Sequence, residues 1–147
     1  MAQNTDLEKI VAKFKAGSNC AQITATYFAE KYGEDVEKIH QLMCSFGGGM
    51  RKGEVCGAVS GGMLALGMKG GNATPDDAER KAKCYADTIA FGNEFKKRNG
   101  SLLCRELLGC DISTPEGKKE FDEKDLHFTF CPRKVLASIE LLEEMGY

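Results

Sequence analysis

The sequence changes character at residues 47–62, which run GGGMRKGEVCGAVSGG and hold seven of the 17 glycines of the chain. Glycine adopts backbone conformations that other residues avoid, so the part up to Gly53 predicts an irregular loop. From Glu54 to about Met68, small and apolar residues predict a helix. Cys56 then falls in its first turn, where free backbone N–H groups and the helix dipole favour a thiolate. We therefore place Cys56 at the centre of the candidate site.

The overall composition predicts a soluble protein of one domain. A chain of 147 residues builds one core, and 42% hydrophobic with 29% charged residues is ordinary for a globular protein. A net charge of −2 without a basic run argues against a nucleic-acid partner. The first residues lack a secretory signal, and no apolar run approaches the roughly 20 residues of a membrane span. We expect no membrane insertion and a cytoplasmic location.

Cap residues and helix breakers divide the chain into predicted helices. They are expected at 5–15, 20–32, from 35 into the glycine loop, 54–68, 75–98, 101–109, 114–123 and from 131 onward. The longest, 75–98, is expected to bury Ala78, Ala82, Tyr85, Ile89 and Phe95. No segment alternates as a β-strand does. The sequence thus predicts an all-α fold: a single-domain, multi-helix bundle with short connections over residues 1–147.

The seven cysteines are the main chemical signal of the chain. A reducing compartment disfavours a structural disulfide framework, so metal binding or redox chemistry is the better interpretation. Four cysteines, Cys20, Cys56, Cys104 and Cys131, stand at or near predicted helix starts, where a thiol pKa of about 8.5 falls to about 3.5–7.5. The other three are Cys44, Cys84 and Cys110. The alternative is that each cysteine packs as a small buried apolar residue.

Several familiar motifs are missing from the sequence. There is no C-x-x-C pair, as in thioredoxin-type dithiols, and no C-x-x-C-H, the attachment motif of covalent haem. The glycines are not followed by the lysine and hydroxyl residue of a phosphate-binding loop. A four-cysteine site would instead collect one ligand from each of four helices, which a helical bundle allows.

Two glycines, Gly57 and Gly61, lie one turn apart on the predicted 54–68 helix. A glycine inside a helix costs up to about 1 kcal/mol relative to alanine, so a close approach must offset it. The approaching group is either another helix or a bound cofactor, and on the second interpretation both glycines are cofactor-binding residues. An exposed glycine face would also permit a homodimer. The two histidines, His40 and His127, are expected to have no special role.

The cysteine segments resemble the C_GCAxxG_C_C family of redox-active proteins. The matching segments are Asn19-Cys20-Ala21-Gln22, Phe46-Gly47-Gly48-Gly49-Met50, Cys56-Gly57-Ala58-Val59-Ser60-Gly61, Cys104-Arg105-Glu106-Leu107-Leu108-Gly109 and Cys131-Pro132. The resemblance covers nearly the whole chain and implies that its shared cysteines are the four at helix starts. A similar module occurs in split-Soret cytochromes c, where cysteines hold an iron–sulfur cluster. The haem motif of those cytochromes is absent here.

These observations lead to competing functions. The first is a redox protein in which Cys20, Cys56, Cys104 and Cys131 hold an iron–sulfur cluster and serve an unidentified redox partner. The same cysteines could instead exchange between thiols and disulfides without any cofactor, with Cys56 as the attacking thiolate. A third hypothesis is a non-redox binding or interaction module stabilised by zinc at a closed four-cysteine site. In the fourth hypothesis the protein is a helical interaction module, and its cysteines serve only as packing residues.

Overall fold

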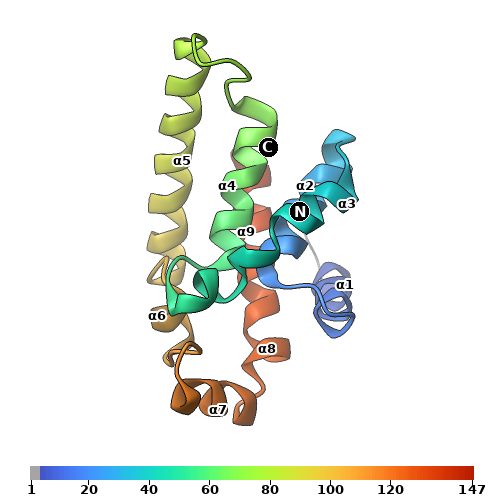
Figure 1. The fold of residues 1–147 in the computed structure, drawn as a ribbon, viewed down its shortest axis with the longest axis vertical. Coiled ribbons are helices and arrows are strands. Elements are labelled where there is room, and N and C mark those ends of the chain that lie inside the picture. The colour runs from blue at the N-terminus through green and yellow to red at the C-terminus, as the bar shows by residue number, and fades with distance from the viewer. Residues whose placement is uncertain (1–3) are drawn as a thin grey trace.

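The structure, a computed structural model that describes residues 4–147, is built from helices (Figure 1). They are α1 (Asn4–Lys15), α2 (Cys20–Tyr32), α3 (Val36–Leu42), α4 (Gly57–Gly70), α5 (Ala78–Asn99), α6 (Cys104–Leu108), α7 (Pro115–Glu123), α8 (Leu126–Thr129) and α9 (Cys131–Glu144). Two short irregular turns, η1 (Cys44–Phe46) and η2 (Gly49–Gly53), connect α3 to α4. Residues 4–147 contain no β-strand, so the predicted all-α fold is confirmed.

Helix α4 is the centre of the bundle because almost every side of it is apolar and small. It packs against α2, α5 and α9 (Figure 1). Its buried residues run from Gly57 to Leu66 along more than one face. Around them lie fully buried large side chains, including Phe28 of α2, Phe91 of α5 and Leu142 of α9. The loop-to-helix stretch that stands out in the sequence therefore leads into the core.

Two glycines of α4 allow its neighbours to come unusually close. A Cβ at Gly61 would lie 2.7 Å from the backbone oxygen of Ala21 in α2. A Cβ at Gly62 would lie 2.8 Å from the ring of Phe91 in α5. On the α9 side, the buried hydroxyl of Ser138 donates a hydrogen bond of 2.7 Å to a backbone oxygen of α4. Close backbone packing therefore fixes α4 relative to three neighbouring helices.

Helix α5 differs from its prediction in both its start and its buried face. It begins at Ala78 with Asp77 as the cap, three residues later than the expected start. Of the residues expected inside, only Phe95 is buried, and Tyr85 and Ile89 are 60% and 63% exposed. Ala78 and Ala82 are exposed as well. The helix has two apolar faces, and the one that contains Phe91 and Phe95 is the one that packs on α4 and α9.

None of the helices in residues 4–147 combines the length and the apolar character that crossing a bilayer requires.

The close packing of α2 on α4 predicts opposite effects for two identical substitutions. Gly61→Ala forces a Cβ against the backbone of Ala21 and should lower the free energy of unfolding by about 1–3 kcal/mol. Gly67→Ala, on the exposed side of the same helix with nothing within 4 Å, should raise it by about 0.5–1 kcal/mol. Urea unfolding followed by circular dichroism measures both. Equal effects of the two substitutions would contradict the proposed packing.

Candidate functional site

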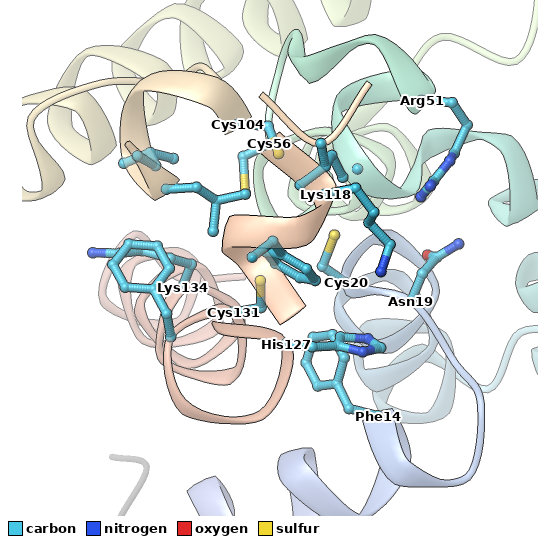
Figure 2. A pocket seen from close by; sticks show the side chains of 16 residues that line it. Phe14, Asn19, Cys20, Arg51, Cys56, Cys104, Lys118, His127, Cys131 and Lys134 are labelled. Carbon is cyan, nitrogen blue, oxygen red and sulfur yellow. The ribbon is translucent and has the colours of Figure 1, made fainter. Parts of the chain in front are cut away.

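The four cysteines at helix starts line one cavity of about 180 Å³ (Figure 2). Cys20 and Cys131 are the first residues of α2 and α9, as the sequence predicts, and Cys104 is the first residue of α6, which begins after Leu103 rather than at Ser101. Cys56 immediately precedes α4, because that helix begins at Gly57 rather than at Glu54. The structure therefore brings together all four cysteines from separate parts of the chain. Their chemical role stays a prediction.

A local capping motif fixes the start of α2 and with it Cys20. The side-chain oxygen of Asn19 accepts a hydrogen bond from the backbone N–H of Gln22, and the Gln22 side chain accepts one from the backbone N–H of Asn19. This reciprocal pair is a capping box, which satisfies free N–H groups at the helix end. The Asn19 amide also donates to the backbone oxygen of Cys44, 3.0 Å away. Cys20 thus starts a helix that is anchored to the segment after α3.

A short backbone bridge holds Cys56 and Cys104 side by side. Val55 and Leu103, the residues just before these cysteines, form an isolated antiparallel β-bridge. The N–H of Cys56 donates to the oxygen of Leu102 at 2.8 Å, and the N–H of Cys104 donates to the oxygen of Glu54 at 2.6 Å. The relative position of these two cysteines therefore depends on backbone hydrogen bonds, which any side-chain substitution leaves in place.

The glycine loop wraps into a left-handed turn beside the cavity. Gly48, Gly49, Met50 and Arg51 all have φ between 59° and 64°. Only glycine adopts this region without strain, and Met50 and Arg51 adopt it at a cost. A Cβ at Gly49 would overlap the backbone of Glu54, so glycine is required there on steric grounds too. The turn places Gly48 and Arg51 on the cavity wall.

Gly57 and Gly61 face α2 and are not among the residues that line the cavity. A Cβ at Gly57 would overlap the sulfur of Cys20, and one at Gly61 would press on the backbone of Ala21. Of the two interpretations of these glycines, tight helix packing is the one that their contacts support. Gly57 nevertheless matters to the site, because its missing side chain leaves the space that the sulfur of Cys20 occupies.

Cys20 carries the most acidic thiol of the four. A hydrogen bond from the thiol of Cys56 lowers the pKa of Cys20 to about 6, and the backbone N–H groups of Gly48, Ala21 and Gly57 act in the same direction. The same hydrogen bond, together with burial, holds the pKa of Cys56 well above its usual range. These two shifts favour the charged form at Cys20 over Cys56, and the role of Cys56 as the attacking thiolate stays a prediction. The helix start alone did not decide the matter, because N–H donors from three segments converge on the other sulfur.

Burial has the opposite effect on the remaining two cysteines of the cavity. It raises the pKa of Cys104 to about 12, and the negative charge of Cys20 acts in the same direction. Burial likewise raises the pKa of Cys131, with Cys20 and Cys104 as further causes. Of the four cysteines, the thiolate form is therefore most favoured at Cys20.

The rest of the cavity wall is apolar and cationic. Arg51, Lys118 and Lys134 line it, and no carboxylate among residues 4–147 does. Lys134 donates to the side-chain oxygen of Asn99 at 2.9 Å, and burial lowers its pKa. Lys118 pairs with Asp122 at the outer edge. The apolar part of the wall comes from Phe14, Leu107, Leu108, Ile112, Phe121 and Phe130. Such a wall suits an anionic group.

Of the two histidines, His127 lines the cavity and His40 does not. His127 lies in the wall between the rings of Phe14 and Phe121, and burial lowers its pKa, which favours the neutral form. His40 is half-buried rather than at the surface: its ring contacts Ser18 and Gln22 near the start of α2, at 3.0 and 3.4 Å. It therefore braces the helix that carries Cys20.

Cys44, Cys84 and Cys110 lie outside the cavity: Cys44 is exposed, Cys84 half-buried on α5 and Cys110 buried just beyond α6. None of the seven cysteines forms a disulfide. Among the described residues, no three His, Cys, Asp or Glu side chains form a group that could hold a metal ion. The four cavity cysteines line one space without forming such a group.

Comparison with known proteins agrees with this distribution of cysteines. A family model described as "Putative redox-active protein (C_GCAxxG_C_C)" matches residues 18–145, which include all four cavity cysteines. The chain belongs to the C_GCAxxG_C_C family. This description supports a redox role in general terms. Neither the curated proteins nor the solved structures yield a match.

Sequence reasoning missed several parts of the site in this C_GCAxxG_C_C protein. Lys118 and Lys134 carry no local signal, because their place on the wall depends on how α7 and α9 pack. The bridge between Val55 and Leu103 is too short for an alternating pattern. Arg51 stands close before Cys56 in the sequence, which is the one signal that could have identified it.

The hydrogen bond between two cysteines predicts a pH profile for the metal-free, reduced C_GCAxxG_C_C protein. Because the pKa of Cys20 is lowered to about 6, its thiolate persists above pH 6 and is lost as the pH falls through that value. Alkylation of Cys20 by iodoacetamide, mapped by mass spectrometry, should follow the same midpoint.

Cys56→Ala removes the largest cause of the shift and should move the midpoint to higher pH. Cys110→Ser, outside the cavity, should leave it unchanged. A midpoint that is the same in Cys56→Ala and wild type would contradict the role of this hydrogen bond.

Proposed function

We propose that this protein transfers electrons and that Cys20, Cys56, Cys104 and Cys131 hold an iron–sulfur cluster. The observation that carries the proposal is one cavity of about 180 Å³ lined by four thiols and three cations, with no carboxylate among its described residues. When bound, such a cluster supplies reversible one-electron chemistry. The general redox role follows from the family, and the cluster is the more specific proposal.

The donor set fits a cluster better than it fits a single ion. Four cysteine thiolates are the ordinary ligands of 2Fe–2S and 4Fe–4S centres. A zinc ion lies about 2.3 Å from each sulfur, which holds four sulfurs within roughly 4 Å of one another. The four cysteines line a cavity of about 180 Å³, which has room for an inorganic centre larger than a single ion.

The charges of the site support the same proposal. Four thiolate ligands give a cluster a net negative charge, and Arg51, Lys118 and Lys134 supply positive charge around it. The apolar part of the wall limits water, which strengthens these interactions. The backbone N–H groups of Gly48, Ala21 and Gly57 already donate to the sulfur of Cys20. Such donors and cations are the means by which a protein sets the reduction potential of a cluster.

Anaerobic purification, followed if necessary by reconstitution with iron and sulfide, tests the cluster directly. We expect a brown protein with visible absorbance and with iron and acid-labile sulfide in equal amounts. Changing any one of Cys20, Cys56, Cys104 or Cys131 to Ser should remove most of both, because each supplies one ligand.

Cys110→Ser is the matched control, since Cys110 and Cys56 are both 8% exposed but only Cys56 lines the cavity. This variant should retain its iron and sulfide. Equal losses in Cys110→Ser and Cys56→Ser, or stoichiometric zinc in place of iron, would refute the cluster. The zinc result would support the closed four-cysteine site instead.

A second candidate function has its own observation, the hydrogen bond between the thiols of Cys20 and Cys56. A thiolate beside a thiol is the arrangement from which a disulfide forms. In that reaction the two sulfurs bond, the thiol proton of Cys56 leaves and two electrons pass to an oxidant. With glutathione disulfide as the oxidant, its S–S bond breaks and two glutathione thiols form, which take up that proton and one more from water.

Oxidation of the metal-free protein by glutathione disulfide distinguishes this candidate. A dithiol protein should lose two hydrogens, and peptide mapping should find Cys20 joined to Cys56. Dithiothreitol should reverse the change. A mixture of pairings, or glutathione left attached to exposed Cys44 alone, would exclude a dedicated Cys20–Cys56 couple.

A further inference from the structure

Two cations, Arg51 and Lys118, differ from the rest of the cavity wall in their exposure. Among the described residues that line the cavity, they are the only ones that are exposed. A residue that lines a cavity and also reaches solvent lies at the opening of that cavity. We call Arg51 and Lys118 the cationic mouth. A molecule that approaches the thiols from solvent therefore meets these two side chains.

The cationic mouth lies on the side of the cavity that carries Cys20. Figure 2 shows the nitrogen-bearing ends of Arg51 and Lys118 on the same side as Cys20 and Asn19. A Cβ at Gly48 would lie 2.6 Å from Nη1 of Arg51, so the guanidinium packs directly on this glycine. The backbone N–H of Gly48 in turn donates to the sulfur of Cys20. The guanidinium is therefore close to the most acidic thiol of the cavity.

The charge of Arg51 acts on the cavity without a carboxylate to balance it. Arg51 forms no ion pair with any residue between 4 and 147. Burial raises the pKa of Cys104, and the positive charge of Arg51 opposes that rise. The guanidinium thus stabilises negative charge on a sulfur inside the cavity.

No carboxylate in the described part of the chain lines the cavity. Carboxylates of the neighbouring segments pair or hydrogen-bond elsewhere: Glu54 with Arg105, Asp111 with Ser113, Asp122 with Lys118, Glu120 with Lys124 and Glu123 with Lys119. The charge of Lys118 is therefore partly offset at the outer edge. The charge of Arg51 is not, so it is the stronger attraction for an anion that enters the mouth.

The backbone at Arg51 supports a role in binding. Its φ of 60° lies in the left-handed region, which glycine adopts without strain and arginine does not. Strained positions cluster at ligand sites, where the surrounding structure fixes them. The turn directs Arg51 to the mouth, whereas the next residue, Lys52, is exposed but does not line the cavity. Two adjacent cations thus differ in that only one faces the thiols.

We infer that the cationic mouth binds small anions, with a preference for carboxylates, and holds them beside the sulfur of Cys20. A guanidinium matches a carboxylate with two parallel N–H donors, which a chloride ion cannot use in the same way. A cavity of about 180 Å³ has room for a molecule of a few heavy atoms. The ligand class is a small organic acid. The inference does not rest on the proposed cluster, because the mouth and Cys20 are already in place in the metal-free protein.

Two alkylating reagents that differ in charge test the mouth in the reduced, metal-free protein. Iodoacetate is an anion and iodoacetamide is neutral, so the ratio of their rates at one thiol measures the attraction of the anion separately from the pKa of that thiol. Mass spectrometry follows the reaction at Cys20, and the same ratio with mercaptoethanol is the reference. The wild-type ratio should exceed the reference and should fall as sodium chloride is added.

Substitutions at the mouth identify the cation that carries the effect. Arg51→Gln should lower the ratio at Cys20 about two- to fivefold, as expected for an exposed ion pair. Arg51→Lys keeps the charge and should retain most of the ratio. Lys118→Gln should have a smaller effect, because Asp122 already offsets that charge. Lys52→Gln is the matched control, since it removes an exposed cation from the same turn, and it should leave the ratio unchanged.

Competition tests the preference for carboxylates. At equal ionic strength, acetate should slow the reaction of iodoacetate with Cys20 more than chloride does, and this difference should disappear in Arg51→Gln. Equal slowing by acetate and chloride in the wild-type protein would overturn the preference.

Three further results would overturn the inference. They are a wild-type ratio no higher than the reference, a ratio that Arg51→Gln leaves unchanged, and an equal fall in Arg51→Gln and Lys52→Gln. Should Arg51→Gln fail to fold by circular dichroism, the salt dependence of the wild-type ratio and the response of Lys118→Gln still decide. Because no metal is present, each of these failures is separate from a failure of the cluster proposal.

Discussion

The site depends on how closely the backbones of α2 and α4 approach each other. At Gly57 the sulfur of Cys20 occupies the space where a Cβ would stand, and at Gly61 the backbone of α2 leaves no room for one. Two glycines inside a helix cost up to about 1 kcal/mol each, and close packing against α2 offsets that cost. The same approach puts Cys20 within hydrogen-bonding distance of Cys56. The packing of α2 on α4 and the contact between Cys20 and Cys56 therefore depend on the same close approach of the two helices.

Backbone contacts also place Cys104, so three of the four cysteines are fixed to one another by the main chain. The bridge of Val55 with Leu103 joins the starts of α4 and α6 across 48 residues of sequence. Cys131 arrives differently, on α9, which a buried hydrogen bond from Ser138 holds against α4. A redox centre benefits from this arrangement, since ligands on rigid elements change position little when the charge of the centre changes.

The sequence predicts what is local and misses what depends on distant neighbours. The helix that begins at Cys20 follows from Asn19 and Gly33, which cap it in the structure as expected. The face of α5 that is buried could not be predicted, since Tyr85 and Phe95 both lie at helical spacing and only the position of α4 decides between them. In the same way, the pKa of Cys20 is lowered by the thiol of Cys56 and by backbone N–H groups that include those of Gly48 and Gly57, which come from other segments. No pattern around Cys56 contains that information.

The strained turn and the cations of the cavity wall both bear on the electrostatics of the site. Met50 and Arg51 adopt left-handed backbone conformations, which cost roughly 1–2 kcal/mol per residue, and such strain persists where surrounding structure fixes it. The turn directs the backbone N–H of Gly48 at the sulfur of Cys20, and it places Arg51 on the cavity wall. Of the three cations on the wall, Lys118 pairs with Asp122, whereas Arg51 and Lys134 form no ion pair within residues 4–147. Burial lowers the pKa of Lys134, and a charged Cys56 would raise it, so this lysine and the deprotonated cysteine favour each other's charged forms. These cations favour negative charge in the cavity, which the proposed cluster with its four thiolate ligands would supply.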